Sequence, residues 1–265
     1  MWYSQDLKQR KNWYGEVADA YNRGRPAYPQ QLINRAIELE LVPKEGMILE
    51  IGSGPGTATT AFATLGFSMV CLEPSLAFCQ LGRQNCAKYP NVEIINTSFE
   101  EWELETEKFD AVLAANSFHW VSSDIKYQKA ADALLENSSI ILLWNTPPEP
   151  DSEVVQMLNE VYRTRVPFFA GSEDFKSHKQ NLAKFGENLL DSGLFKNLMS
   201  EDLMSEVTYS IDDYLALLSS LSPYIALERQ QRDYLFAGLR ETLEKNCGNS
   251  IQTSYLSMLQ VAQKS

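Results

Sequence analysis

The sequence predicts a doubly wound α/β fold, in which helices cover both faces of a mostly parallel sheet. Several short runs are apolar at every position instead of every second one, which indicates strands buried on both faces. These runs alternate with amphipathic stretches through the first half of the chain, the order expected of β-α-β units. The first run ends in three glycines at alternate positions, and the carboxyl end of such a strand is where α/β sheets bind ligands.

The first two predicted strands each lead into a helix. Residues 47–51 form the first apolar run, and the helix after its glycines is expected to reach residue 65. The second run, 67–72, precedes a predicted helix over 75–88, for which Ser75 is the expected N-cap.

Three later apolar runs complete the predicted parallel strands, at residues 92–95, 109–115 and 139–144. Between the last two, Ser122 or Ser123 is expected to cap a helix that ends near residue 135.

The rest of the chain is expected to add helices and two strands, near 198–209 and 250–263, to one seven-stranded domain. A helix is predicted from Gln30, and Pro147 and Pro148 should interrupt regular structure after the fifth strand. We therefore divide the single domain, 1–265, into an N-terminal helical cap (1–42), a ligand-binding core (43–145), a helical insertion over the ligand cleft (146–193) and C-terminal strands and helices that complete the sheet (194–265).

Composition excludes several classes of function. Apolar residues make up 44% of the 265 residues, which is enough for a large core. The net charge of −12 opposes binding to nucleic acid or to an acidic membrane surface. No run approaches the roughly 18 apolar residues that span a bilayer, and no signal peptide is expected.

The four cysteines form no Cys-x-x-Cys pair, and there are only two histidines, so we expect no structural zinc site. This cysteine usage fits a reducing, cytoplasmic setting.

The glycine turn follows an acidic residue in the pattern Glu50-Ile51-Gly52-Ser53-Gly54-Pro55-Gly56. Glycines here allow a sharp turn and a close approach of the backbone to a ligand. A dinucleotide site instead needs Gly-x-Gly-x-x-Gly, and Thr57 stands where its third glycine would be. Glu50 would also repel a diphosphate, so the charge favours a cationic ligand.

Acidic and polar residues follow the next two strands. Glu73 ends the second strand, where a carboxylate can accept both hydroxyls of a ribose, as it does in dinucleotide folds too. Ser98 and Phe99 follow the third strand, where a hydroxyl and a ring could hold an adenine. The alternative for both places is an ordinary loop at a strand end.

On these motifs the sequence resembles the type 11 group of class I methyltransferases. Glu-x-Gly-x-Gly-x-Gly at 50–56, the acid Glu73 and Phe-Asp-Ala-Val at 109–112 match that group. The segments 21–29, with its Arg-Pro-x-Tyr-Pro, and 115–120, with Phe-His-Trp, are similar to the branch of trans-aconitate methyltransferase-like proteins. The resemblance implies a Rossmann-like methyltransferase fold and the cofactor S-adenosylmethionine, whose product is S-adenosylhomocysteine.

The resemblance also implies roles for individual residues. Gly52, Ser53, Gly54 and Asn116 would line the methionine part of the cofactor, Glu73 its ribose, and Ser98 and Phe99 its adenine. Tyr21 and Arg25 would close over it, with Arg25 near its carboxylate. The full predicted cofactor set adds three neighbours, Glu50, Gly56 and Pro74.

The acceptor side is expected near His119 and Trp120, after the fourth strand, and near Phe168 and Phe169 in the insertion. His119 is a candidate general base, or alternatively a structural or substrate-contacting residue, and a carboxylate acceptor would need no base. Arg163 and Arg165 could receive an acidic substrate or lie on a solvated helix face.

We expect a monomer or homodimer that methylates a small molecule at a carboxylate or a hydroxyl. The alternatives are an NAD(P)-dependent oxidoreductase and a non-catalytic S-adenosylmethionine-binding protein.

Overall fold

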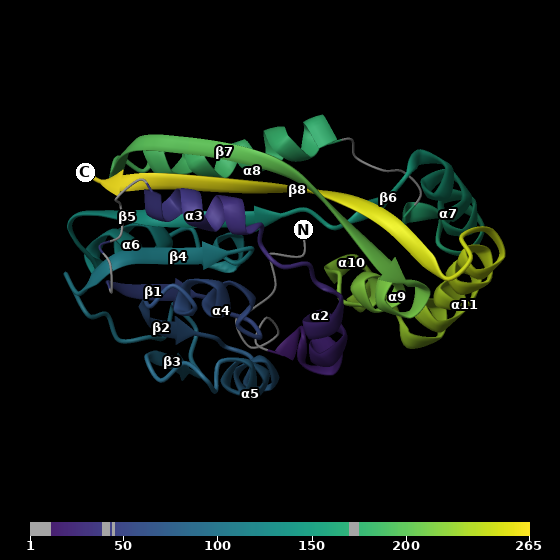
Figure 1. Cartoon of the computed structure of the whole chain (residues 1–265), viewed down its shortest axis with the longest axis horizontal. Coiled ribbons are helices and arrows are strands. Elements are labelled where there is room, and N and C mark those ends of the chain that lie inside the picture. Colours follow the sequence, from purple (N-terminus) through teal and green to yellow (C-terminus); the bar gives the residue numbers. More distant parts are fainter. Residues whose placement is uncertain (1–11, 39–42, 44–45, 170–174) are drawn as a thin grey trace.

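A computed structural model describes residues 12–38, 43, 46–169 and 175–265. Its centre is an eight-stranded sheet in the order β3-β2-β1-β4-β5-β8-β6, with β7 also paired to β8 (Figure 1). The strands are β1 (Met47–Ile51), β2 (Ser68–Leu72), β3 (Val92–Ile95), β4 (Phe109–Ala115), β5 (Leu134–Asn145), β6 (Glu149–Pro150), β7 (Phe195–Ser210) and β8 (Ser250–Lys264).

The helices precede and follow these strands in the alternation that the sequence predicts. The helices of the first half are η2 (Gly15–Val17), α2 (Ala18–Gly24), α3 (Gln30–Glu38), α4 (Thr57–Ala63), α5 (Leu76–Asn85), η3 (Phe118–Trp120) and α6 (Lys126–Ala133). The second half has α7 (Ser152–Arg165), η4 (Pro167–Phe169), α8 (Phe175–Asp191), α9 (Ile211–Ser219), α10 (Ser222–Ile225) and α11 (Arg229–Asn246).

The predicted parallel sheet is confirmed. β1 pairs in parallel with β2 and β4, β2 with β3, and β4 with β5, whereas β8 runs antiparallel to its neighbours. The eighth strand is β6, a two-residue pairing with β8 directly after the prolines that were expected to stop regular structure. Ser75 caps α5 as predicted, since its hydroxyl accepts a hydrogen bond from the Phe78 amide.

The expected cap of α6 is wrong. Its N-cap residue is Ile125, and no side chain caps it. Ser122 contributes its carbonyl instead, which accepts from the amides of Ile125 and Lys126. The turn before α6 is therefore closed by backbone, so a serine hydroxyl is not needed there.

Successive residues of β1 point into two different cores, which is why all of its residues except Glu50 are apolar. Ile48 belongs to a cluster with α3, α4 and α5 on one face of the sheet. Leu49 belongs to a cluster with α6 and α8 on the other face. The predicted helix from Gln30 is α3, and it buries its apolar stripe against the first of these faces.

A third core lies outside the sheet and forms a helical lobe of α7, α9, α10 and α11 around the far ends of β7 and β8 (Figure 1). The two described helices of the predicted insertion, 146–193, therefore pack in different places. α7 packs against α11 in this lobe, whereas α8 packs on β7 and β8. Because β7 and β8 extend past the parallel strands, the lobe lies at one end of the sheet. α7 belongs to this lobe, and α8 lies on the sheet itself.

Within the described residues, no helix combines the length and apolarity that a membrane crossing requires.

Candidate active site

The candidate site is a cavity of about 1170 Å³, its open mouth included, at the carboxyl ends of the parallel strands. Its floor comes from the ends of β1, β2, β4 and β5 and from the glycine turn before α4. β1 lies between β2 and β4 in the sheet, so the chain reverses its winding at this point. Crevices at such a reversal are where open α/β sheets bind ligands.

The glycine turn has a left-handed backbone that brings main chain to the cavity. Gly52 has φ +67°, and a Cβ there would lie 2.7 Å from the Cβ of Ser117. Gly54 has φ +56°, and its missing Cβ would meet no protein atom within 4 Å. Because Gly54 lines the cavity, its bare backbone leaves room for a ligand.

Gly56 has a different task from the one predicted. It does not line the cavity, and a Cβ on it would lie 3.1 Å from the sulfur of Cys86. Its φ of +87° and the close approach of α5 both require glycine. Gly56 therefore packs the turn against α5, and it does not border the cavity.

Glu73 holds the turn in place from the end of β2. Its Oε2 accepts from the Gly54 amide and its Oε1 from the Ser75 amide, each at 2.8 Å. Burial raises the pKa of Glu73 to about 7, against the lowering effect of these two bonds. Each carboxylate oxygen has a second lone pair, so Glu73 can still accept from two ligand hydroxyls.

Glu50 lies beneath the turn and is fully buried, yet it borders the cavity. Its Oε2 accepts from the Thr59 hydroxyl at 2.5 Å, and its Oε1 has no hydrogen-bond partner among the described residues. Burial raises the pKa of this carboxyl to about 7. A buried acceptor without a partner is unfavourable, so this oxygen is suited to a positively charged donor from a ligand.

Asn116 joins the ends of β4 and β5 and, through Asn145, the N-terminal segment. Asn116 has φ +51°, its Oδ1 accepts from the Asn145 amide at 2.7 Å, and its Nδ2 donates to the Asn145 carbonyl at 2.8 Å. The side chain of Asn145 in turn donates to the carbonyls of Pro26 and Ala27. The Arg-Pro-x-Tyr-Pro segment is thereby held across the carboxyl ends of the strands.

The predicted residues of that segment also border the cavity. Tyr21 comes from α2, and the Arg25 guanidinium lies 4.6 Å from the centre of its ring. Tyr21 also packs edge-on against Phe78 of α5, with ring centres 4.9 Å apart. Tyr14 stacks on Phe78 and meets Trp120 edge-on, so a group of four aromatic rings encloses one side of the cavity.

Ser98, Phe99 and Pro74 border the cavity at the ends of β2 and β3, as predicted. The Ser98 hydroxyl donates to Glu101, and Phe99 stacks on Trp102. Both residues are almost completely buried, so a ligand would meet their edges and backbone.

Three of the four predicted acceptor-side residues do not border this cavity. His119 packs among the rings of Trp120, Trp144 and Phe185, and burial, helped by the nearby positive charge of Lys126, lowers its pKa to about 3. Phe168 is 69% exposed, and Phe169 packs on Tyr224 in the helical lobe. Of the predicted acceptor side, Trp120 alone borders the cavity in the part of the chain that is described.

The two arginines of α7 also lie away from the cavity. Arg163 is exposed, and Arg165 stacks on the ring of Tyr234 and donates to its carbonyl. The solvated helix face is therefore the interpretation that the structure favours over a receptor for an acidic substrate.

Sequence reasoning missed several residues that border the cavity, among them Tyr14, Tyr28, Phe78, Asn145 and Thr146. Tyr28 and Asn145 carried a usable signal, because Tyr28 stands in the Arg-Pro-x-Tyr-Pro segment and Asn145 directly follows the predicted strand 139–144. Tyr14 had none, since only the folded chain brings it to α5.

Comparison with known proteins agrees with this arrangement. A methyltransferase domain family matches residues 48–137. An uncharacterised methyltransferase of Mycobacterium tuberculosis is 31% identical over 136 residues, which are 51% of this chain and 53% of that protein. The match thus spans about half of that relative. An uncharacterised methyltransferase-like protein of Schizosaccharomyces pombe is 30% identical over 179 residues, 65% of this chain and 67% of that protein.

Solved structures show the same fold. A protein of Anaeromyxobacter dehalogenans described as a type II methyltransferase has a TM-score of 0.67, with 19% identity over 90% of this chain and 97% of its own. Haemonchus contortus phosphoethanolamine N-methyltransferase 2, in complex with S-adenosylmethionine, has a TM-score of 0.54, with 15% identity over 98% of this chain and 60% of its own. The chain belongs to the class I methyltransferase family.

Proposed function

We propose that this protein transfers a methyl group from S-adenosylmethionine to a small molecule. The observation that carries the proposal is the open space at Gly54 between two buried carboxylates, Glu50 and Glu73. A cavity with bare backbone and acidic walls suits a nucleoside that carries an ammonium and a sulfonium, and it disfavours a diphosphate. When bound, this cofactor would supply a methyl group on a positively charged sulfur, ready for an in-line displacement.

Each end of the cofactor has residues of suitable chemistry. Glu73 would accept the ribose hydroxyls, and the unpartnered Oε1 of Glu50 would accept from the ammonium. Arg25 would bind the carboxylate, because guanidinium and carboxylate pair with two parallel bonds. The glycine turn would pass under the methionine part, while Ser98 and Phe99 border the adenine.

The acceptor is proposed to be small because aromatic side chains crowd the cavity. Tyr14, Tyr21 and Trp120 enclose one side and would exclude water from the reacting atoms, which strengthens electrostatic interactions there. Alignment and proximity supply much of the acceleration in such a displacement. A carboxylate acceptor needs no base, and a hydroxyl acceptor could not use His119, which packs outside the cavity.

A transfer assay with radiolabelled S-adenosylmethionine tests the proposal on matched acids, phenols and amines. We expect label to appear on at least one small acceptor, and substitution of Gly54 by valine should remove it. Tight binding of S-adenosylhomocysteine with no transfer to any acceptor would favour the non-catalytic binding protein. Failure to bind either form of the cofactor would refute the proposal.

A further inference from the structure

We propose that Ser220, which directly follows α9, is a positioning residue that aims Arg25 at the carboxylate of the cofactor. The proposal rests on the proposed function and goes beyond it, because Ser220 does not border the cavity. It would make the helical lobe part of the cofactor site through one buried serine.

Ser220 accepts two hydrogen bonds along one edge of the Arg25 guanidinium. The Nε of Arg25 donates to the Ser220 hydroxyl at 3.0 Å, and its Nη2 donates to the Ser220 carbonyl at 2.9 Å. The hydroxyl is itself fixed, since it donates to the Leu217 carbonyl at 2.7 Å. Ser220 is completely buried, so water does not compete for these bonds.

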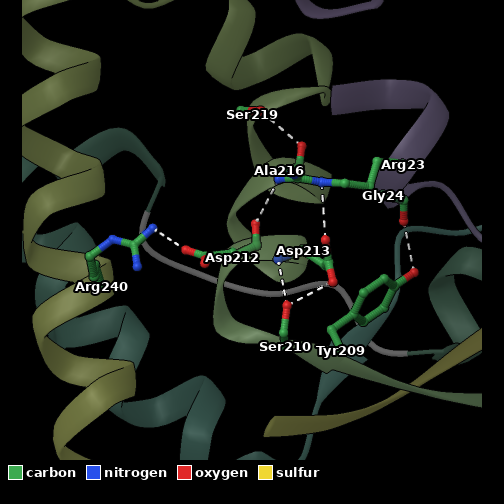
Figure 2. Close-up of polar contacts among 9 residues, drawn as sticks. All are labelled: Arg23, Gly24, Tyr209, Ser210, Asp212, Asp213, Ala216, Ser219 and Arg240. Carbon is green, nitrogen blue, oxygen red and sulfur yellow. Dashed lines mark hydrogen bonds and ion pairs between the residues drawn. The ribbon is translucent and has the colours of Figure 1, made fainter. Parts of the chain in front are cut away.

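The neighbouring residues of α2 contact α9 and the end of β7. Gly24 lies so close to α9 that a Cβ on it would be 2.7 Å from the Leu217 backbone nitrogen. The Tyr209 hydroxyl donates to the Gly24 carbonyl at 2.8 Å, and Arg23 pairs with Asp213 at 3.0 Å (Figure 2). Arg25 follows directly, so both its backbone and its side chain are held by this junction.

The two hydrogen bonds to Ser220 leave the other edge of the guanidinium available. Arginine has five N–H donors in a planar fork, and the bonds to Ser220 use two of them. The remaining donors are on Nη1 and Nη2, and Arg25 borders the cavity. The Tyr21 ring packs on the guanidinium, so its plane is fixed as well. A pre-oriented fork of this kind loses little rotamer freedom when it binds a carboxylate.

The test compares two ligands that differ in the amino-acid part. S-adenosylhomocysteine carries the carboxylate, and 5′-deoxy-5′-methylthioadenosine carries the same nucleoside and sulfur without it. By calorimetry, Ser220→Ala should weaken binding of S-adenosylhomocysteine about tenfold, in line with loss of a hydrogen bond to a charged group. Its affinity for methylthioadenosine should stay within about twofold of wild type. If Ser220 had only a structural role, Ser220→Ala would weaken binding of both ligands to the same extent.

Ser219→Ala is the matched control. The Ser219 hydroxyl donates to the Ala216 carbonyl in the last turn of α9 (Figure 2). Because Arg25 donates to Ser220 and not to this hydroxyl, both affinities should be unchanged. Should Ser220→Ala not fold, Arg25→Lys serves instead, because lysine cannot hold Ser220 and a carboxylate in one fork, and it should show the same selective loss.

Equal weakening of both ligands by Ser220→Ala, or no weakening of either, would overturn the positioning role. If wild-type protein binds neither ligand, the proposed function itself fails.

Discussion

The glycine turn and the helical lobe show two ways in which this chain builds structure. The turn between β1 and α4 takes its shape from neighbours in sequence, with left-handed glycines and a carboxylate one strand away. The lobe of α7 and α9–α11 is assembled from segments far apart in the sequence. It packs around the ends of β7 and β8, which extend past the parallel strands (Figure 1). The turn lines the cavity, whereas the lobe bonds to the N-terminal segment through Arg23 and Arg25.

This difference predicts that the same substitution at two left-handed glycines will change ligand affinity at one of them and not at the other. Gly54 in the turn and Gly248 before β8 both have left-handed φ, +56° and +64°, and neither has a protein atom within 4 Å of a missing Cβ. A β-branched residue at either place adds similar strain, on the order of 1–3 kcal/mol. Only Gly54 borders the cavity.

Gly54→Val should therefore have the largest effect on binding. We expect it to lower the affinity for S-adenosylhomocysteine more than 100-fold, on the order of 3 kcal/mol, because its side chain would occupy ligand space. Gly248→Val should lose comparable thermal stability and keep wild-type affinity. Calorimetry and melting curves on both variants check this, and equal affinity in the two would erase the proposed distinction.

Glu50→Gln should have a smaller effect, and one that depends on pH. The affinity of wild type for S-adenosylhomocysteine should rise between pH 6 and 8, because the Glu50 carboxyl, with a pKa near 7, must ionise to pair with the ammonium. The variant should bind about tenfold more weakly at pH 8 and lose most of this rise. An unchanged pH profile would show that Glu50 does not meet the ligand.

The same group should affect stability without ligand in the opposite direction. The folded pKa is above the unfolded value, so its contribution to stability is present at low pH and is lost as pH rises from about 4.5 through about 7. Melting temperatures should therefore show Glu50→Gln gaining on wild type as pH rises from 5 to 8. Wild type gaining on the variant instead would contradict the burial argument.

His119→Phe should have the smallest effect on binding, within about twofold, because the ring packs among aromatic residues outside the cavity. Its effect should appear in acid. The folded pKa near 3 is below the unfolded value, so stability is lost as pH falls from about 6.5 toward 3. The variant should gain on wild type between pH 7 and 5 in melting curves. A large loss of methyl transfer in this variant would restore His119 as a candidate base.

The two regions also differ in how much of them the sequence could predict. The bounds of β4 agree with the predicted strand, because a strand buried on both faces is apolar at nearly every position. The bounds of β3 agree too, although this edge strand exposes Glu93. The glycine turn and Glu73 could also be predicted, because their arrangement depends on residues that are close in sequence or at the end of the next strand. Local patterns carry this information.

The rest depends on contacts between distant segments, which periodicity does not encode. Asn145 contacts Pro26 and Ala27 across more than a hundred residues, and its amide gave no indication of them. His119 was predicted to be either a general base or a structural or substrate-contacting residue, and the rings of Trp144 and Phe185 that pack on it favour the structural role. The separation of α7 from α8 follows from the length of β7 and β8. The sequence predicted two strands near 198–209 and 250–263, but it did not show that they extend past the parallel strands.

The most direct measurement is a calorimetric titration of the wild-type chain with S-adenosylhomocysteine and, in parallel, with oxidised nicotinamide adenine dinucleotide. The account predicts saturable binding of the first at one site per chain, lost in Gly54→Val, and no binding of the second at millimolar concentration. Binding of the dinucleotide alone would contradict it, because a diphosphate would then be accepted beside Glu50.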